Sequence, residues 1–240
     1  MDRTKEGPLE FIGVGLYTIP EAARILQVNV RTLRGWVEGY TYDTKLRQVQ
    51  QRPVVHRRLK LDKPVLTFYE LIELLFVKLF RKEGVSMQTI RKASIAASKL
   101  FETPYPFAVK RFDTDGKRVF ATLEAEARSR KEARLVEELG LGQTAFDPIV
   151  RQFFRQLDYR GEAEALRYWP EEGGRFVVLD PNRAFGQPID AQTGVPTKSL
   201  FAAFRANGGM DVERVAGWFQ IPSKNVVHAI RYEEVLLQAA

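Results

Sequence analysis

Two stretches of this chain repeat one pattern of short helix, tight turn and second helix. The first is YTIPEAARILQVNVRTLRGWV at 17–37, and the second is DVERVAGWFQIPSKNVVHAI at 211–230. When Thr18 is aligned with Asp211 without gaps, the turn L-Q-V of the first stretch falls on F-Q-I of the second. Thr and Asp are both favourable helix N-caps. The repeat therefore predicts two helix-turn-helix units, and no other feature constrains the fold as strongly.

Local signals mark both helices of the first unit. Thr18 and Glu21 have the spacing of a capping box, which starts a helix, and Asn29 can cap the helix that follows. That second helix is predicted to have an apolar face and a basic face at helical spacing. The apolar face contains Val30, Leu33, Trp36 and Val37, and the basic face contains Arg31, Arg34 and Gly35. Because glycine has no side chain, the basic face can approach another molecule closely.

In a DNA-binding helix-turn-helix, the second helix enters the major groove and presents its N-terminal side chains to base edges. Arg pairs with guanine and Asn with adenine, and each good bidentate pair gives about 1–3 kcal/mol of discrimination. The candidates for DNA binding are Asn29, Arg31, Thr32 and Arg34 in the first unit, and Lys224, Asn225, His228 and Arg231 in the second. All eight are expected on exposed faces. The alternative for either unit is that it only packs or dimerises.

A basic segment follows the first unit, and residues 40–66 are predicted to form a wing. Between Lys45 and Lys60 there are six Lys and Arg residues, one His and no acid. Such charges contact DNA phosphates and fix the register of the protein on the duplex. The wing candidates for DNA binding are Arg47, Arg57 and Arg58. The formal net charge of +7 also favours a polyanionic partner, although a solvated basic loop is the alternative.

The remaining patterns predict a mainly α fold with small β elements, of the α+β class. Amphipathic helices are expected from Phe68 to Phe80, with an apolar stripe at 71, 74, 75 and 79, and from Ser86 to about Phe101. A hairpin is expected over 107–120 around Asp115–Gly116. The predicted domains are a winged DNA-binding domain at 1–105, a hairpin and helical connector at 106–160, and a C-terminal helix-turn-helix domain at 161–240.

Several classes of function are not expected. The chain has no Cys, which excludes disulfide frameworks and Cys-ligated zinc sites. The two histidines do not have a metal-binding spacing, and there is no phosphate-binding loop or nucleophile elbow. We therefore expect no enzyme activity, no metal and no cofactor. The N-terminus lacks the pattern of a signal peptide, and the longest apolar stretch is interrupted by Glu73 and Lys78, so a cytoplasmic location away from the membrane is expected.

The chain also resembles two known families. Residues 17–37, the basic wing and LTFYELIELLFVKLFRKEGVSMQTIRKA resemble the winged DNA-binding domain of MerR-type regulators. The run VVLDPNRAFGQPIDAQTGVPTKSLFAAFRANGGMDVERVAGWFQIPSKNVVHAIRYEE is similar to a helix-turn-helix domain of bacterial antitoxins, with its D-P-x-x-x-F-G-x-P-I and T-G-V-P-T motifs. The combination resembles long VapB-type antitoxins, which are encoded beside PIN-type toxins. Many MerR-type regulators sense metals through cysteines, and this chain has none.

This resemblance implies an antitoxin that neutralises a PIN-type RNase toxin and binds the operator of its own operon as a homodimer. The resemblance also implies that the toxin has an acidic metal site, which basic and apolar side chains of the antitoxin could block. The candidate contact segment is IVRQFFRQLDY, with Arg151, Phe154 and Arg155 as toxin-binding residues. Phe153 and Phe154 have the alternative role of core residues. A free-standing MerR-like regulator without a toxin is the alternative function, and the neighbouring reading frame would distinguish the two.

Overall fold

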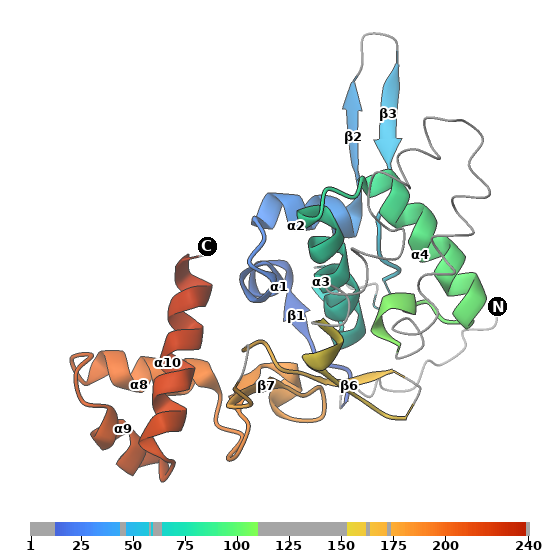
Figure 1. Ribbon diagram of the computed structural model, residues 1–240. Coiled ribbons are helices and arrows are strands. Elements are labelled where there is room, and N and C mark those ends of the chain that lie inside the picture. Colours follow the sequence, from blue (N-terminus) through green and yellow to red (C-terminus); the bar gives the residue numbers. More distant parts are fainter. Residues whose placement is uncertain are drawn as a thin grey trace, which may run out of the picture.

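The computed structural model of the chain is mainly helical with small antiparallel sheets, as predicted (Figure 1). It describes residues 13–43, 47–57, 59, 64–109, 153–161, 164–171 and 174–238. In that part, one two-stranded sheet pairs β1 (Tyr17–Thr18) with β4 (Val65–Leu66), and another pairs β2 (Tyr40–Asp43) with β3 (Gln48–Gln51). A four-stranded sheet has the order β5 (Leu157–Tyr159), β6 (Ala165–Tyr168), β7 (Val177–Leu179) and β8 (Pro188–Asp190).

The first helix-turn-helix unit consists of α1 (Ile19–Leu26) and α2 (Val30–Glu38). The predicted capping box is present, because the backbone N–H of Thr18 donates to Glu21 Oε2 at 2.9 Å and the N–H of Glu21 donates to Thr18 Oγ1 at 3.4 Å. Asn29 caps α2, and its Oδ1 accepts a hydrogen bond from the Arg31 backbone N–H at 2.9 Å. Both predicted helix starts are confirmed.

The second unit consists of α9 (Val212–Phe219) and α10 (Ser223–Gln238), and it has the same turn as the first. Gln27 and Gln220 both adopt the left-handed conformation, with φ of 51° and 54°, which is uncommon for residues other than glycine. The residue after each glutamine donates its backbone N–H to an alanine carbonyl in the preceding helix, at 2.9 Å for Val28 and 3.1 Å for Ile221. The predicted repeat therefore holds at the level of backbone geometry.

Helix α3 (Phe68–Lys82) lies between α1 and α4 (Met87–Phe101) in Figure 1 and is buried on nearly every side. Two of its buried residues are acids, Glu70 and Glu73. Glu73 Oε1 accepts backbone N–H bonds from Phe107 at 2.6 Å and Ala108 at 2.9 Å. Burial raises the pKa of the Glu73 carboxyl well above its ordinary value. These bonds fix the short helix η1 (Pro106–Ala108) against α3. The rest of the predicted hairpin, including Asp115–Gly116, lies outside the described residues.

The main apolar core includes residues from the N-terminal helices and from the middle of the chain. Phe153 and Phe154 both pack against Phe76 of α3, with ring centroids 4.1 and 5.6 Å away. The same core extends to Leu179, so it includes residues from all three predicted domains. A separate cluster lies among α8 (Thr197–Ala206), α9 and α10. The division into three domains stays a prediction.

The D-P-x-x-x-F-G-x-P-I motif joins the C-terminal part of the chain to β1. The Tyr17 hydroxyl donates to the Gly186 carbonyl at 2.6 Å, and the Leu16 backbone N–H donates to the Phe185 carbonyl at 2.9 Å. Gly186 has a φ of 79°, and a Cβ at this position would lie 2.5 Å from the Tyr17 hydroxyl oxygen. Only glycine fits there, so the Phe-Gly pair of the motif fixes its loop against the strand that leads into α1.

Phe154→Ala is expected to lower the free energy of unfolding by about 3–5 kcal/mol, because it removes a buried ring from the core. Denaturant unfolding of the full chain measures this change. The neighbouring Arg155 is exposed, so Arg155→Ala serves as the matched control and should change the stability by less than about 0.5 kcal/mol. Wild-type stability of Phe154→Ala would mean that the ring is not part of the core.

Candidate nucleic-acid interface

The orientation of α2 is set by the side chains buried beneath it. Leu33, Trp36 and Val37 are buried in the main core, as predicted. Val30 was expected on the same buried face, but it is 36% exposed. It lies in the first turn of α2, where it is not among the residues of the core or those packed against it. The opposite face of the helix is therefore turned outward.

The four predicted DNA-contacting residues of the first unit are all exposed, namely Asn29, Arg31, Thr32 and Arg34. The Asn29 side-chain oxygen caps α2, which leaves its amide N–H groups to donate to a ligand. Arg34 Nε lies 3.9 Å from Glu38 Oε2, and both side chains are exposed. An ion pair of this kind contributes little and does not prevent Arg34 from contacting another molecule. Their contact with bases stays a prediction.

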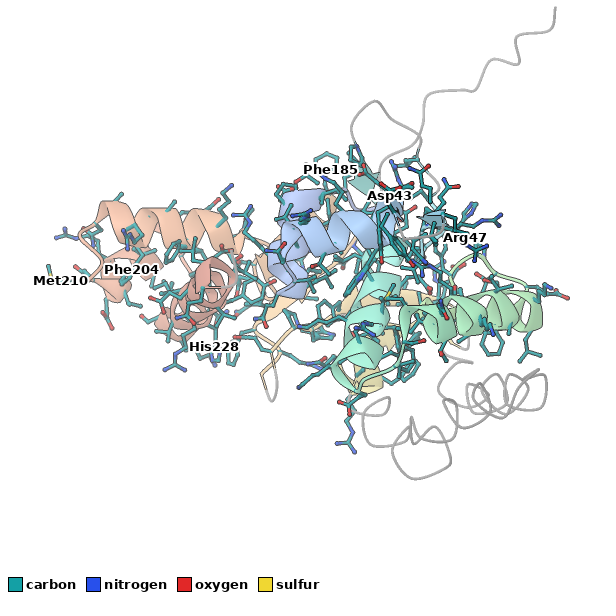
Figure 2. The ribbon with its side chains drawn as sticks, turned by 90° about the horizontal axis from the view of Figure 1, so that it is seen from above. Asp43, Arg47, Phe185, Phe204, Met210 and His228 are labelled. Atoms are coloured by element: carbon teal, nitrogen blue, oxygen red, sulfur yellow. The ribbon has the colours of Figure 1, made fainter. Side chains whose placement is uncertain are left out.

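Strands β2 and β3 form a hairpin that projects away from the helices next to α2 (Figure 1). Asp43 is the last residue of β2 and Arg47 immediately precedes β3, so both lie where the two strands connect; both are labelled in Figure 2. At its base, the Val54 backbone N–H donates to the Trp36 carbonyl at 2.9 Å. The predicted wing is therefore present as a hairpin, and Val54 and Val55 are buried beneath it in a loop rather than in a strand.

A single arginine of α4 joins the wing to the helical body. Arg91 Nε donates to the Arg52 carbonyl at 2.9 Å, and Arg91 Nη1 donates to Gln51 Oε1 at 2.9 Å. The planar guanidinium group can hold two acceptors at once, which an ammonium group on a flexible chain does less well. Sequence reasoning missed this residue, because its two acceptors lie 39 and 40 positions away in the chain.

The predicted basic residues of the wing differ in their surroundings. Arg47 is exposed near the hairpin tip. Arg57 is half-buried, and its Nη2 donates to the Leu59 carbonyl at 3.2 Å. Part of its guanidinium group is therefore used within the protein. Arg58 lies outside the described residues. Phosphate contact by these three residues stays a prediction.

The expectation of an exposed reading face on the second unit is wrong for Asn225. It is only 3% exposed, and its Nδ2 donates to Asp190 Oδ1 of β8 at 2.7 Å. Asp190 is itself buried, and a buried carboxylate requires such donors. Lys224 and Arg231 are exposed, and their roles stay predictions.

His228 is also turned toward the protein rather than outward. Its ring stacks on Phe176 with centroids 3.8 Å apart, and its Nδ1 lies 3.0 Å from Glu171 Oε1. The ring is therefore half-buried, whereas an exposed position was expected, and its contact with DNA stays a prediction. Figure 2 also shows His228 well separated from the wing tip at Asp43 and Arg47.

The predicted toxin-binding segment is partly covered. Phe153 and Phe154 are buried at 2% and 5% exposure, which is the alternative role given to them. Phe154 therefore cannot act as a surface anchor in this structure, because its ring is packed against α3. Arg155 is exposed, and Arg151 lies outside the described residues.

The described part of the chain contains no group of three or more His, Asp or Glu side chains placed to hold a metal ion. None of its helices is long and apolar enough to cross a membrane.

Known proteins resemble both the first unit and most of the chain. Residues 15–94 match a family described as "Putative DNA-binding HTH domain". A protein of Mycobacterium tuberculosis named "Putative antitoxin VapB45" is 31% identical over 205 residues, and the match covers 80% of this chain and 84% of that protein. The crystal structure of Rv2018 from Mycobacterium tuberculosis is similar with a TM-score of 0.73 and 26% identity, covering 91% of this chain and 99% of that one.

Arg31→Ala and Arg34→Ala are each expected to weaken binding to the preferred duplex by about 1–3 kcal/mol and to relax base preference. Gel-shift titration with DNA from upstream of the chain's own reading frame measures both effects. Arg205→Ala, which removes an exposed arginine from α8, is the control and should bind normally. Unchanged affinity in both α2 variants would show that α2 is not part of the DNA interface.

Arg91→Ala is expected to loosen the wing without unfolding the helices. Amide hydrogen exchange in β2 and β3 should become about tenfold faster, which corresponds to the loss of roughly one net hydrogen bond. Arg91→Lys should restore only part of the protection, because an ammonium group does not hold both acceptors equally well. Lys99→Ala, at an exposed position of α4, is the control. Wild-type exchange in Arg91→Ala would show that this arginine does not hold the wing.

Proposed function

We propose that this chain, which belongs to the family of VapB-type antitoxins, neutralises a PIN-type RNase toxin and represses its own operon. The chain carries a helix-turn-helix DNA-binding domain in its N-terminal part. Family membership does not specify three points, which we propose here: the class of toxin, the operator as the DNA target, and the residues that make each contact.

The observation that carries operator binding is the outward basic face of α2 beside a projecting hairpin. Arg31, Thr32 and Arg34 are exposed together, while the apolar residues of the same helix are buried. This arrangement suits insertion of α2 into the major groove, with the hairpin next to the adjacent backbone. The second unit is less suited to this role, because Asn225 and His228 are occupied by contacts within the protein.

Dimerisation follows from the geometry of DNA recognition. One α2 helix contacts one half-site, and helix-turn-helix proteins reach two half-sites about one helical turn apart by forming a symmetric dimer. We therefore propose a homodimer, in the cytoplasm where operator DNA is found. The proposed role requires binding but no chemical step, so we propose that the chain is not an enzyme.

Toxin binding is supported by membership of the antitoxin family and by charge. A toxin with an acidic metal site is complementary to a chain with a formal net charge of +7. Arg155 remains a candidate contact because it is exposed at the end of the segment that packs on α3, and Arg151 is proposed with it. Removing a charge that is buried in an interface weakens binding strongly. Substitution of these arginines therefore tests directly whether the segment binds the toxin.

A free-standing regulator is the competing proposal, since the α2 face and the wing would serve it equally well. The two proposals differ in whether a toxin gene neighbours the reading frame. They also differ in whether a neighbouring gene product arrests growth when it is produced alone.

Production of the neighbouring gene product in a host cell is expected to arrest growth, and co-production of this chain is expected to restore it. The two proteins should also co-purify, and the complex should bind the upstream duplex. Arg155→Ala should reduce rescue, whereas Arg205→Ala should not. Lack of arrest by the neighbouring product, or arrest without rescue, would favour the free-standing regulator.

A further inference from the structure

The two faces of the wing hairpin carry different side chains. Side chains alternate along a strand, and directly paired residues share a face. The pairs Tyr40–Gln51 and Tyr42–Val49 therefore form one face, which we call the tyrosine face. The pairs Thr41–Gln50 and Asp43–Gln48 form the other, which we call the polar face.

The tyrosine face looks toward the helical body. A Cβ added at Gly35 of α2 would lie 3.4 Å from the Tyr40 ring, so the ring rests directly on the outward face of the helix. On the same hairpin face, Gln51 accepts its hydrogen bond from Arg91 of α4. Gly35 lies one turn after Arg31, on the same side of α2. The tyrosine face and the basic face of α2 are therefore parts of one continuous surface.

Both tyrosine rings remain open to solvent although they lie close together. Their centroids are 6.0 Å apart, and Tyr40 and Tyr42 are 51% and 43% exposed. A tyrosine hydroxyl is both donor and acceptor, and tyrosine is one of the side chains that donate to phosphate oxygens. In the described part of the chain, neither hydroxyl has a hydrogen-bond partner.

Charge decides which face of the wing suits DNA. The polar face carries the Asp43 carboxylate, which repels phosphates, whereas the tyrosine face has no acid. Arg57, one of the three arginines expected to contact phosphates, is partly engaged with the Leu59 carbonyl. A duplex lying along α2 would therefore meet the tyrosine face first.

We propose that Tyr40 and Tyr42 bind the sugar-phosphate backbone of duplex DNA next to the groove that α2 enters, each donating its hydroxyl to a phosphate oxygen. This inference rests on the proposed DNA-binding function and adds to it the contact surface of the wing. The tyrosines fix the register of α2 on the duplex and do not read bases.

The test compares the full chain with the double variant Tyr40→Phe/Tyr42→Phe, which keeps both rings and removes both hydroxyls. The probe is the duplex from upstream of the chain's own reading frame. The variant should bind at least about tenfold more weakly, because each removed hydroxyl makes a hydrogen bond to a charged group, which is the stronger class. The loss should be similar for a duplex of unrelated sequence, because every sequence presents the same phosphates. A thermal melt should be unchanged.

Matched variants separate the two faces. Thr41→Ala/Gln50→Ala, on the polar face, should bind as wild type. Phosphate ethylation of the probe should interfere with wild-type binding at positions flanking the α2 site, and interference there should weaken in the tyrosine variant. Wild-type affinity of the Phe/Phe variant, or an equal loss in the polar-face variant, would overturn the proposal.

Parallel titration of Arg31→Ala distinguishes this proposal from the function on which it rests. Weak binding by Arg31→Ala with normal binding by the Phe/Phe variant would reject the tyrosine contact alone. Normal binding by both would reject α2 and the tyrosine face together as the DNA contact.

Discussion

The burial of Leu33, Trp36 and Val37 beneath α2 is the interaction on which the rest of the interface depends. A helix of nine residues has little stability of its own in water, so its rotation is decided by the side chains that the core accepts. The same core also positions the wing, because the Trp36 carbonyl accepts a hydrogen bond from the Val54 backbone N–H at the base of the hairpin. Gly39 then directs the chain into β2, and a Cβ there would lie 2.3 Å from the Gln51 carbonyl oxygen. One packing arrangement thus orients both the exposed polar side chains of α2 and the wing.

The two helix-turn-helix units show that an identical turn does not imply an identical role. Gln27 and Gln220 have nearly the same backbone conformation, and both turns close with the same hydrogen bond. The units differ in what lies against the second helix. Nothing in the described chain covers Arg31 and Arg34, which are exposed, whereas β8 supplies a buried carboxylate that binds Asn225. The tertiary environment, and not the motif, decides which unit can present its polar face.

Much of the fold could be predicted because its signals are local. Thr18, Asn29 and Ser86 each cap a helix within three residues of the group they bind. Helical spacing also identified part of the buried side of each helix, namely Leu33, Trp36 and Val37 of α2 and Leu71, Leu74 and Leu75 of α3. Apart from Val30, the errors arose from contacts between residues far apart in the chain. Asn225 binds a carboxylate 35 positions away, and Arg91 binds a glutamine 40 positions away. Composition and spacing carry no information about such partners. The contact between the wing and α4 and the burial of Asn225 could therefore be found only in the structure.

The central proposal is that DNA binds to the first unit and its wing rather than to the second unit. Hydrogen–deuterium exchange of the full chain with and without the upstream duplex tests it directly, since it reports on both units in one experiment. The account predicts slower exchange in residues 29–37 and 40–43 when DNA is added, with no change in 223–231. Protection confined to 223–231, with α2 and β2 unaffected, would contradict it.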